Sequence, residues 1–218
     1  MDLRDLYEML LAHFQVENWW PSDSAFEVIV GSILTQQTSW ENVTRSLDMM
    51  RSRGLLSSRA LSNVALGELE DVVRPCGFYR QKAERIVALA RYMEEEFDGD
   101  PSELLGGDLD EVRERLLSLR GVGKETADSI LLFAGGRPKF VAAAYVSRIL
   151  SRTGLLVSDE YDEIQSFVES EFSTDPGELA TFYALLVQLA KSHCRTRPAC
   201  ASCPIMRECE TGHAHVMK

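Results

Sequence analysis

Residues 119–150 decide the fold, and they read LRGVGKETADSILLFAGGRPKFVAAAYVSRIL. A Gly-Val-Gly turn joins two segments whose apolar residues recur at helical spacing. Two helices joined by a glycine hairpin direct backbone N–H groups outward, which suits an anionic oxygen such as a DNA phosphate. An ordinary tight turn has the same local pattern. The residues expected to contact DNA are Arg120, Gly121, Gly123, Lys124 and Thr126.

The remaining chain also has helical periodicity. Apolar stripes run from Leu3 to Leu11, from Phe26 to Ile33, from Ile164 to Val168 and from Leu179 to Leu189. No segment alternates as a half-buried strand does, and no internal repeat is present. The pattern predicts an all-α protein of about a dozen helices.

Composition and charge narrow the class of protein. The chain has 218 residues, of which 45% are hydrophobic, enough for one large or two small domains. It has no apolar run that could span a membrane, and its acidic N-terminal segment does not resemble a signal peptide, so we expect a cytoplasmic protein. The net charge of −11 excludes a uniformly basic DNA binder. The charge is segregated, however: residues 120–152 hold six basic residues against two acidic ones, and residues 153–190 hold eight acidic residues and no Lys or Arg.

Four of the five cysteines lie close together near the C-terminus. They are Cys194, Cys200, Cys203 and Cys209. In a cytoplasmic chain this spacing favours metal ligation over disulfides, and four thiolates suit zinc and an iron–sulfur cluster equally well. Cys76 lies outside the group and is expected to be a small buried hydrophobic residue.

Three tryptophans, Trp19, Trp20 and Trp40, allow two interpretations. Each alone is most simply explained by core packing. Together they are typical of a site that holds a base turned out of a duplex. Because tryptophan faces attract cations, such a site would favour purines alkylated at N3 or N7, which carry a positive charge.

These features resemble the helix-hairpin-helix–Gly/Pro–Asp DNA glycosylases of the endonuclease III superfamily, above all the bacterial 3-methyladenine DNA glycosylases. The resemblance runs from Trp19 to about Glu169 and rests on the motifs Trp19-Trp20-Pro21, TQQTSW, Gly77-Phe78-Tyr79, GVGKETAD and Tyr161-Asp162-Glu163. It implies two helical lobes with a DNA-binding cleft between them. The first lobe is residues 22–133, ending in the hairpin; the second is residues 1–21 plus 134–218, with the cysteine loop 194–209. For that loop it implies a [4Fe–4S] cluster, with zinc as the alternative.

The resemblance also implies roles for single residues. Trp40 and a tryptophan of the Trp19-Trp20-Pro21 motif would sandwich the flipped base, and Gln36 would fill the gap that the base leaves. Members that also cleave the strand carry a lysine at the position of Glu125, so a monofunctional glycosylase is expected. The catalytic Asp of the family is replaced by Ala143. The chain is therefore either an inactivated or slow enzyme or a damage sensor.

The sequence leads us to expect a monofunctional glycosylase that excises an alkylated purine from double-stranded DNA and acts as a monomer. Three alternatives stay open on the same residues. One is a mismatch or deaminated-base glycosylase, or an endonuclease III-type lyase acting at abasic sites. The second is a non-catalytic protein that binds damaged DNA, and the third is a helical metal protein without a DNA role.

Overall fold

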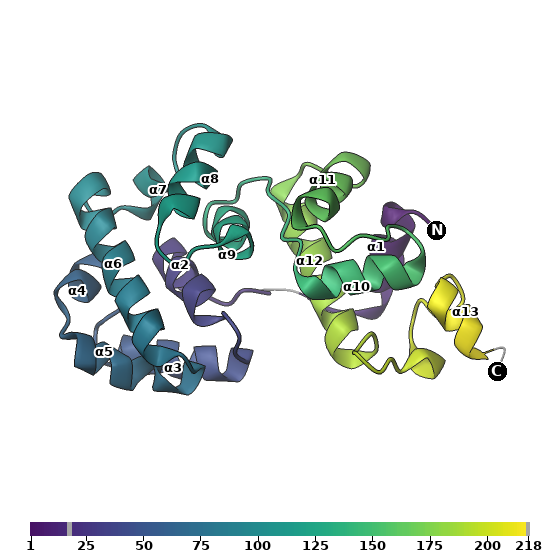
Figure 1. Ribbon diagram of the computed structural model, residues 1–218, viewed down its shortest axis with the longest axis horizontal. Helices are drawn as coiled ribbons and strands as arrows, with labels where there is room; N and C mark the ends of the chain where they lie inside the picture. The colour runs from purple at the N-terminus through teal and green to yellow at the C-terminus, as the bar shows by residue number, and fades with distance from the viewer. Residues whose placement is uncertain (17–18, 217–218) are drawn as a thin grey trace. The chain divides into compact units, whose positions relative to one another are not determined.

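The computed structural model describes residues 1–16 and 19–216 (Figure 1). These residues form thirteen α-helices, two 3-10 turns and one π-helical turn, and no strand occurs among them. The all-α prediction is therefore confirmed.

The chain forms two compact units. One unit is Trp20–Arg137, and the other combines Met1–Trp19 with Pro138–Lys218. The boundaries of the continuous unit lie two residues before and four residues after the predicted 22–133. We call Trp20–Arg137 the continuous unit and the other the split unit.

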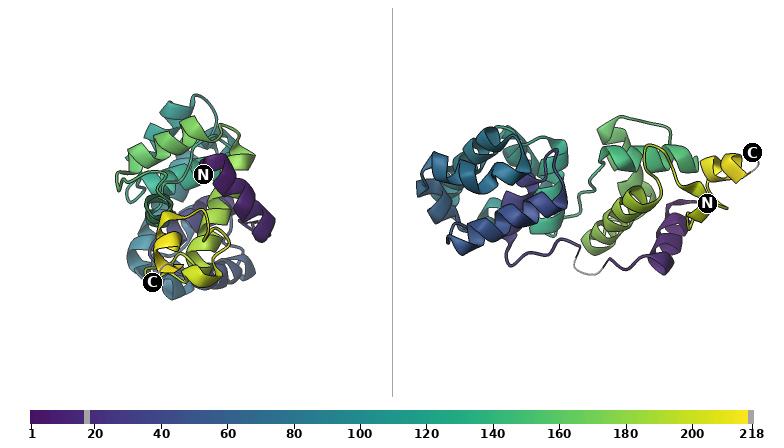
Figure 2. Two further views of the ribbon diagram at one scale, coloured as in Figure 1. Left: turned by 90° about the vertical axis from the view of Figure 1, so that its right-hand side faces the viewer. Right: turned by 90° about the horizontal axis from the view of Figure 1, so that it is seen from below.

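The continuous unit is built around its longest helix, α6. Helices α4 and α5 pack along α6 (Figure 2). Helix α2 packs against the π-helical turn η2. Its elements are α2 (Ala25–Leu34), α3 (Trp40–Ser52), α4 (Ser58–Asn63), α5 (Leu66–Val73), η1 (Arg74–Cys76), α6 (Tyr79–Phe97), α7 (Pro101–Leu104), α8 (Leu109–Ser118), α9 (Lys124–Ser129) and η2 (Ile130–Ala134). Ser24, Ser57 and Asp108 cap the first turns of α2, α4 and α8 by accepting backbone N–H groups, as short polar side chains do at helix starts.

A buried lysine ties two segments of this unit together. Lys82 on α6 is 1% exposed, and its ammonium donates to the carbonyl of Leu34 at 2.9 Å and to that of Cys76 at 2.7 Å. Burial lowers the pKa of Lys82. An enclosed ammonium is tolerated because its hydrogen bonds replace those with water. Lys82 therefore anchors the end of α2 and the end of η1 to the same point of α6.

The split unit is built around α12, against which α1 and α10 pack. Its elements are α1 (Leu3–His13), α10 (Ala144–Thr153), α11 (Tyr161–Glu171), α12 (Pro176–Ser192), the 3-10 turn η3 (Cys200–Ser202) and α13 (Glu210–Val216). Arg4 of α1 pairs with Glu178 of α12 at 2.8 Å and also donates to the carbonyl of Phe172. This ion pair fixes the N-terminal helix to a part of the chain that is distant in sequence.

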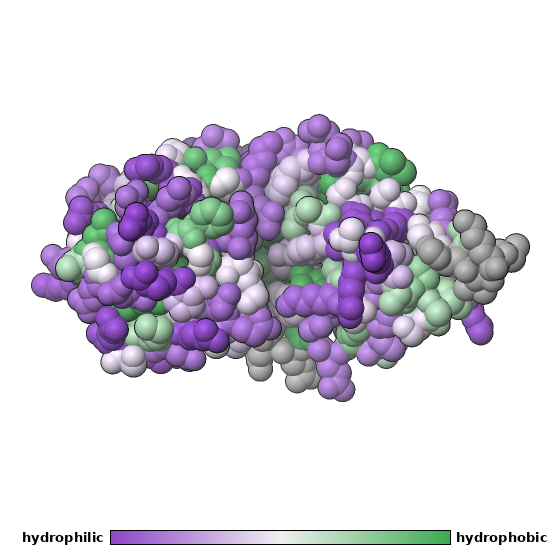
Figure 3. Space-filling model, turned by 60° about the horizontal axis from the view of Figure 1, so that its bottom comes forward, coloured by the Kyte–Doolittle hydropathy of each residue, from purple (hydrophilic) through white to green (hydrophobic). Residues whose placement is uncertain are grey.

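Large apolar patches are absent from the face drawn in Figure 3, where hydrophobic residues lie scattered among hydrophilic ones. Among the described residues, no helix combines the length and apolarity that a membrane crossing requires.

We expect Lys82→Met to lower the free energy of unfolding by about 2 to 4 kcal/mol, because two buried carbonyls lose their donor. The measurement is urea-induced unfolding followed by circular dichroism. Arg45→Met is the control: it places the same methionine at an exposed position of the same unit, on α3, and it should change stability by less than about 0.5 kcal/mol. Equal effects of the two variants would show that Lys82 does not anchor the fold.

The pairing of Glu178 with Arg4 predicts a pH dependence. The hydrogen bond from Arg4 is the main reason that the pKa of Glu178 falls from 4.5 to about 2. A carboxylate with a lowered folded-state pKa stabilises the fold fully above its unfolded pKa and loses this effect as the pH falls toward the folded value. Glu178→Gln should therefore be less stable than the wild type near neutral pH, and this difference should shrink as the pH falls from about 4.5 to about 2.

Unfolding midpoints at a series of pH values measure this difference. Glu171→Gln alters an exposed glutamate of the same unit and serves as the control. A stability difference for Glu178→Gln that is independent of pH would contradict the assigned role of the ion pair.

Candidate functional site

The predicted hairpin lies between α8 and α9. Its turn is closed by the N–H of Val122, which donates to the carbonyl of Leu119 at 3.1 Å. Gly121 has a φ of +83°, a conformation that side chains disfavour, and Gly123 is the residue before α9. Of the predicted DNA contacts, Arg120, Gly121, Gly123 and Lys124 are exposed, whereas Thr126 is buried. The hairpin is thus present, with its basic residues at the surface.

The two adjacent glutamines after α2 differ in their surroundings. The amide of Gln36 donates to the carbonyl of Gly121 and to the hydroxyl of Thr126, both at 3.0 Å. Gln37 is exposed and has a φ of +54°, a strained conformation for a residue other than glycine. The sequence analysis named Gln36 and not Gln37. Which of these two neighbours is exposed depends on contacts with the distant hairpin.

A second exposed side chain on strained backbone precedes α6. Phe78 is 61% exposed and has a φ of +46°. It lies two residues after Cys76, as Gln37 lies three residues after Leu34, and both of those carbonyls bind Lys82. Two turns with exposed tips therefore start from one buried anchor. The Gly77-Phe78-Tyr79 motif was the only signal of Phe78 in the sequence.

The structure separates the three tryptophans. Trp20 contacts Trp40 edge to face, with ring centroids 5.4 Å apart at 78°, and lies 5.1 Å from the ring of Phe133. Trp19 belongs to the split unit, where the ammonium of Lys191 lies 5.7 Å from its ring centroid. The continuous unit therefore has an aromatic cluster of Trp20, Trp40 and Phe133, and Phe133 was not predicted.

Trp20 has an unusual environment. Its ring lies over Gly31 of α2, where even a Cβ would be in contact with it. Its indole N–H is enclosed, and among the described residues it has no hydrogen-bond partner. An enclosed donor without a partner is costly, so the packing of Trp20 against α2 has to outweigh this cost.

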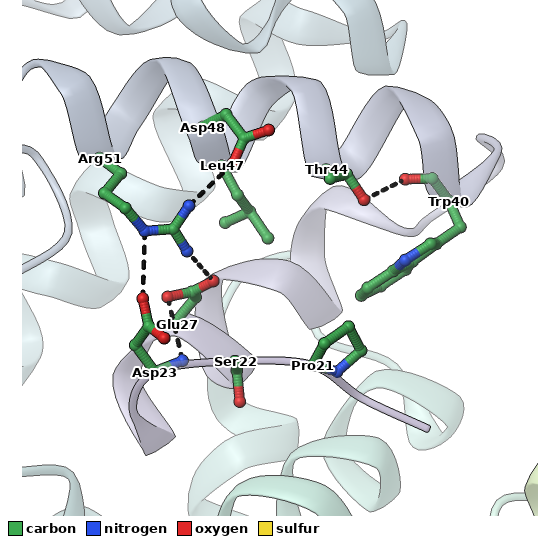
Figure 4. Close-up of a pocket in the computed structure, with 9 residues that line it drawn as sticks. All are labelled: Pro21, Ser22, Asp23, Glu27, Trp40, Thr44, Leu47, Asp48 and Arg51. Carbon is green, nitrogen blue, oxygen red and sulfur yellow. Dashed lines mark hydrogen bonds and ion pairs between the residues drawn. The ribbon is translucent and has the colours of Figure 1, made fainter. Parts of the chain in front are cut away.

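A cavity of about 450 Å³ adjoins Trp40 and Pro21 (Figure 4). At its far end Arg51 pairs with three carboxylates, at 3.2 Å from Asp23, 2.7 Å from Glu27 and 2.8 Å from Asp48. Three carboxylates against one guanidinium leave the lining with a net negative charge. The sequence analysis did not identify this group, whose members come from α3, from the first turn of α2 and from the segment just before α2.

The two positions that distinguish reaction types are Glu125 and Ala143. Glu125 is exposed on the first turn of α9, but surrounding protein atoms remove part of its hydration and raise the pKa of its carboxyl. Ala143 is 2% exposed and is the N-cap residue of α10, where its side chain offers no capping hydrogen bond. Neither position supplies an amine, and Ala143 supplies no carboxylate.

The four clustered cysteines line one narrow cavity together with Arg152 of α10. Arg148 and Arg152 hold this loop: they donate to the carbonyl of Cys194 at 2.9 Å and to that of Arg195 at 2.6 Å. Burial is the main reason that the pKa values of the Cys203 and Cys209 thiols are raised. Within the described residues, no three such side chains converge closely enough for a single metal ion.

Comparisons with known proteins agree with this geometry. The family model described as HhH-GPD superfamily base excision DNA repair protein matches residues 30–173. A Methanocaldococcus jannaschii protein, provisionally assigned as a DNA repair glycosylase, is 40% identical over 94% of both chains. The structure of Helicobacter pylori 3-methyladenine DNA glycosylase bound to 1,N6-ethenoadenine is similar with a TM-score of 0.77 and 27% identity, covering 88% of this chain and 98% of that one.

A trapped endonuclease III–DNA covalent intermediate shares the fold, with a TM-score of 0.82 at 22% identity and 99% coverage of both chains. The family match spans more than half of the chain, and the archaeal relative is similar over almost its full length. The chain therefore belongs to the HhH-GPD superfamily of base excision DNA repair proteins, as a DNA repair glycosylase of the endonuclease III family.

Proposed function

We propose that this chain binds duplex DNA through its hairpin, turns a damaged purine out of the helix and holds that base beside Trp20 and Trp40. The proposed substrate is an alkylated purine similar to 3-methyladenine, and the proposed reaction is hydrolysis of its N-glycosidic bond without strand cleavage. The proposed partner is double-stranded DNA with a damaged base, bound by a monomer in the cytoplasm. The resemblance to the Helicobacter pylori enzyme supports this substrate class.

The observation that carries this proposal is the charge around Trp40. One side of the ring adjoins a cavity whose lining has three carboxylates and one guanidinium. Alkylation at N3 or N7 gives a purine a positive charge, which an aromatic face and a negative field both favour over a neutral base. A mismatched or deaminated base is neutral and gains neither, so the mismatch alternative is less favoured.

We assign opening of the duplex to Gln37 and Phe78. Apolar side chains that insert between base steps unstack them, and an enzyme that acts on a flipped base must compensate for the lost stacking. Phe78 and Gln37 are exposed on neighbouring anchored turns, which suits insertion. The family resemblance implies that Gln36 fills this gap, but in this structure the Gln36 amide donates to Gly121 and Thr126 of the hairpin region.

The absence of strand cleavage follows from Glu125. Strand cleavage by this family proceeds through an amine that attacks the sugar, and a carboxylate cannot form the imine. The neighbouring Lys124 does not replace it, because one residue along an α-helix turns the side chain by about 100°. The side chain of Glu125 instead adds a negative group to the first turn of α9.

Ala143 determines how fast the reaction proceeds. A carboxylate at the start of α10 would stabilise the positive charge that develops on the sugar and would orient the attacking water. Without it, hydrolysis depends on the leaving group, and a cationic purine leaves without being protonated. Ala143 also favours a second candidate function, in which the chain recognises damaged DNA without turnover.

We expect Ala143→Asp to raise release of 3-methyladenine from alkylated DNA by about 10²-fold, the usual effect of one well-placed electrostatic group. Ala144→Asp is the matched control: it places the same carboxylate one residue later, at an exposed position. Single-turnover assays with high-performance liquid chromatography of the released base provide the measurement.

Three outcomes separate the candidates. Equal rates for both variants would remove Ala143 from the proposed site. Binding of damaged duplex without release by any variant would establish the non-catalytic function. Faster release of uracil or thymine than of 3-methyladenine by Ala143→Asp would establish the mismatch alternative.

We propose further that Cys194, Cys200, Cys203 and Cys209 hold a [4Fe–4S] cluster, as is typical of the endonuclease III family. The four thiols line one cavity, and the two arginines of α10 fix the loop around them. When bound, such a cluster cross-links the loop by thiolate ligation. Because Ala143 is the N-cap residue of the same helix, we assign the loop a supporting role for α10.

Cys203→Ser should abolish the visible absorption of thiolate-ligated iron and the equal amounts of iron and acid-labile sulfide in the purified protein. Cys76→Ser is the control: this cysteine is buried beside Ser46, outside the cavity, and its variant should keep the iron. Stoichiometric zinc without sulfide in the wild type would establish the alternative metal.

A further inference from the structure

Gln36 makes three hydrogen bonds that join parts of the continuous unit far apart in sequence. Its Nε2 donates to the carbonyl of Gly121 and to the hydroxyl of Thr126, and its Oε1 accepts from Arg85 of α6 at 2.7 Å. A guanidinium only donates, so Arg85 fixes the orientation of the Gln36 amide and directs its N–H groups toward the hairpin. Both ends of this amide are therefore occupied.

Arg85 also contacts the hairpin directly. A Cβ at Gly121 would collide with the Arg85 side chain, so the guanidinium occupies the space that only glycine leaves open. Gly121 is consequently required twice, once for its φ of +83° and once for this contact. Arg85 is half-buried, whereas Arg120, which lines the same pocket, is exposed.

Gln36, whose amide is held by these three hydrogen bonds, directly precedes Gln37, whose backbone is strained. Within the described part of the chain the Gln37 side chain makes no such hydrogen bond, and the residue is exposed and has a left-handed φ. A residue in that conformation persists only where the surroundings determine it. On one side those surroundings are the three hydrogen bonds of Gln36.

We infer that Arg85 and Gln36 are positioning residues that brace the Gln37 turn against the hairpin, so that binding of phosphate by the hairpin sets where Gln37 enters the duplex. This inference rests on the proposed function of the site. Neither residue touches the base. The two residues couple the hairpin to the Gln37 turn through hydrogen bonds of 2.7 and 3.0 Å within the protein, and not through an electrostatic interaction with the DNA.

The test compares two affinities of the full chain by fluorescence anisotropy. One duplex is undamaged; the other contains a tetrahydrofuran abasic analogue next to 2-aminopurine, whose fluorescence reports unstacking. We expect Gln36→Met to leave the affinity for undamaged duplex within about twofold and to reduce the preference for the abasic duplex about tenfold, which corresponds to about 1.4 kcal/mol. The rise in 2-aminopurine fluorescence should fall in parallel.

Three further variants test the separate contributions of Gln36 and Arg85. Gln36→Glu keeps the acceptor for Arg85 but removes both donors, so it should behave like Gln36→Met. Arg85→Met should lose the same preference, and the double variant should lose no more than either single one, because one network is broken. Arg91→Met is the matched control: it removes an arginine from the exposed side of α6 and should have no effect.

The outcomes distinguish failure of this coupling from failure of the proposed function. A wild type without preference for the abasic duplex overturns the proposed function and the coupling together. A wild-type preference that Gln36→Met and Gln36→Glu both keep overturns the coupling alone. Equal loss of affinity for both duplexes, or a loss of thermal stability that accounts for the effect, assigns Gln36 a merely structural role and also overturns it.

Discussion

The ammonium of Lys82 is the constraint on which the continuous unit depends. A buried charge is stable only when hydrogen bonds replace its water, and the two carbonyls that do so end α2 and η1. The same bonds that satisfy the charge fix the starting points of two turns. The exposed Gln37 and Phe78 lie a few residues beyond these points, so their placement follows from the burial of one amine.

Helix α10 anchors the split unit as Lys82 anchors the continuous unit. Its N-cap is Ala143, and its arginines Arg148 and Arg152 hold the backbone of the cysteine loop. One rigid element thus connects the position of the family Asp with the candidate cluster. A loop rich in irregular backbone needs such partners, because its own carbonyls have no helix or sheet to bond. In the proposed function, α10 therefore supports both the cysteine loop and the position of Ala143.

Charge is distributed so that an acidic chain can still bind DNA. The exposed Arg120 and Lys124 flank the hairpin, while the carboxylates around Arg51 lie in the cavity beside Trp40. Local fields, not the net charge of −11, act on a phosphate or on a base within contact distance. The same chain therefore combines a positive hairpin with a negative surrounding for the proposed cationic base.

The sequence by itself determined the helices, the glycine hairpin, the missing carboxylate at Ala143 and the grouping of four cysteines, because each is a local pattern of period or spacing. Only the tertiary structure decided which of two adjacent glutamines is exposed, that Trp19 and Trp20 lie in different units, and that Lys82 is buried. The contacts responsible include ones between residues far apart in sequence: Lys82 and Leu34 are 48 positions apart, and Gln36 and Thr126 are 90. No local period records such contacts, since they arise only when separate helices pack.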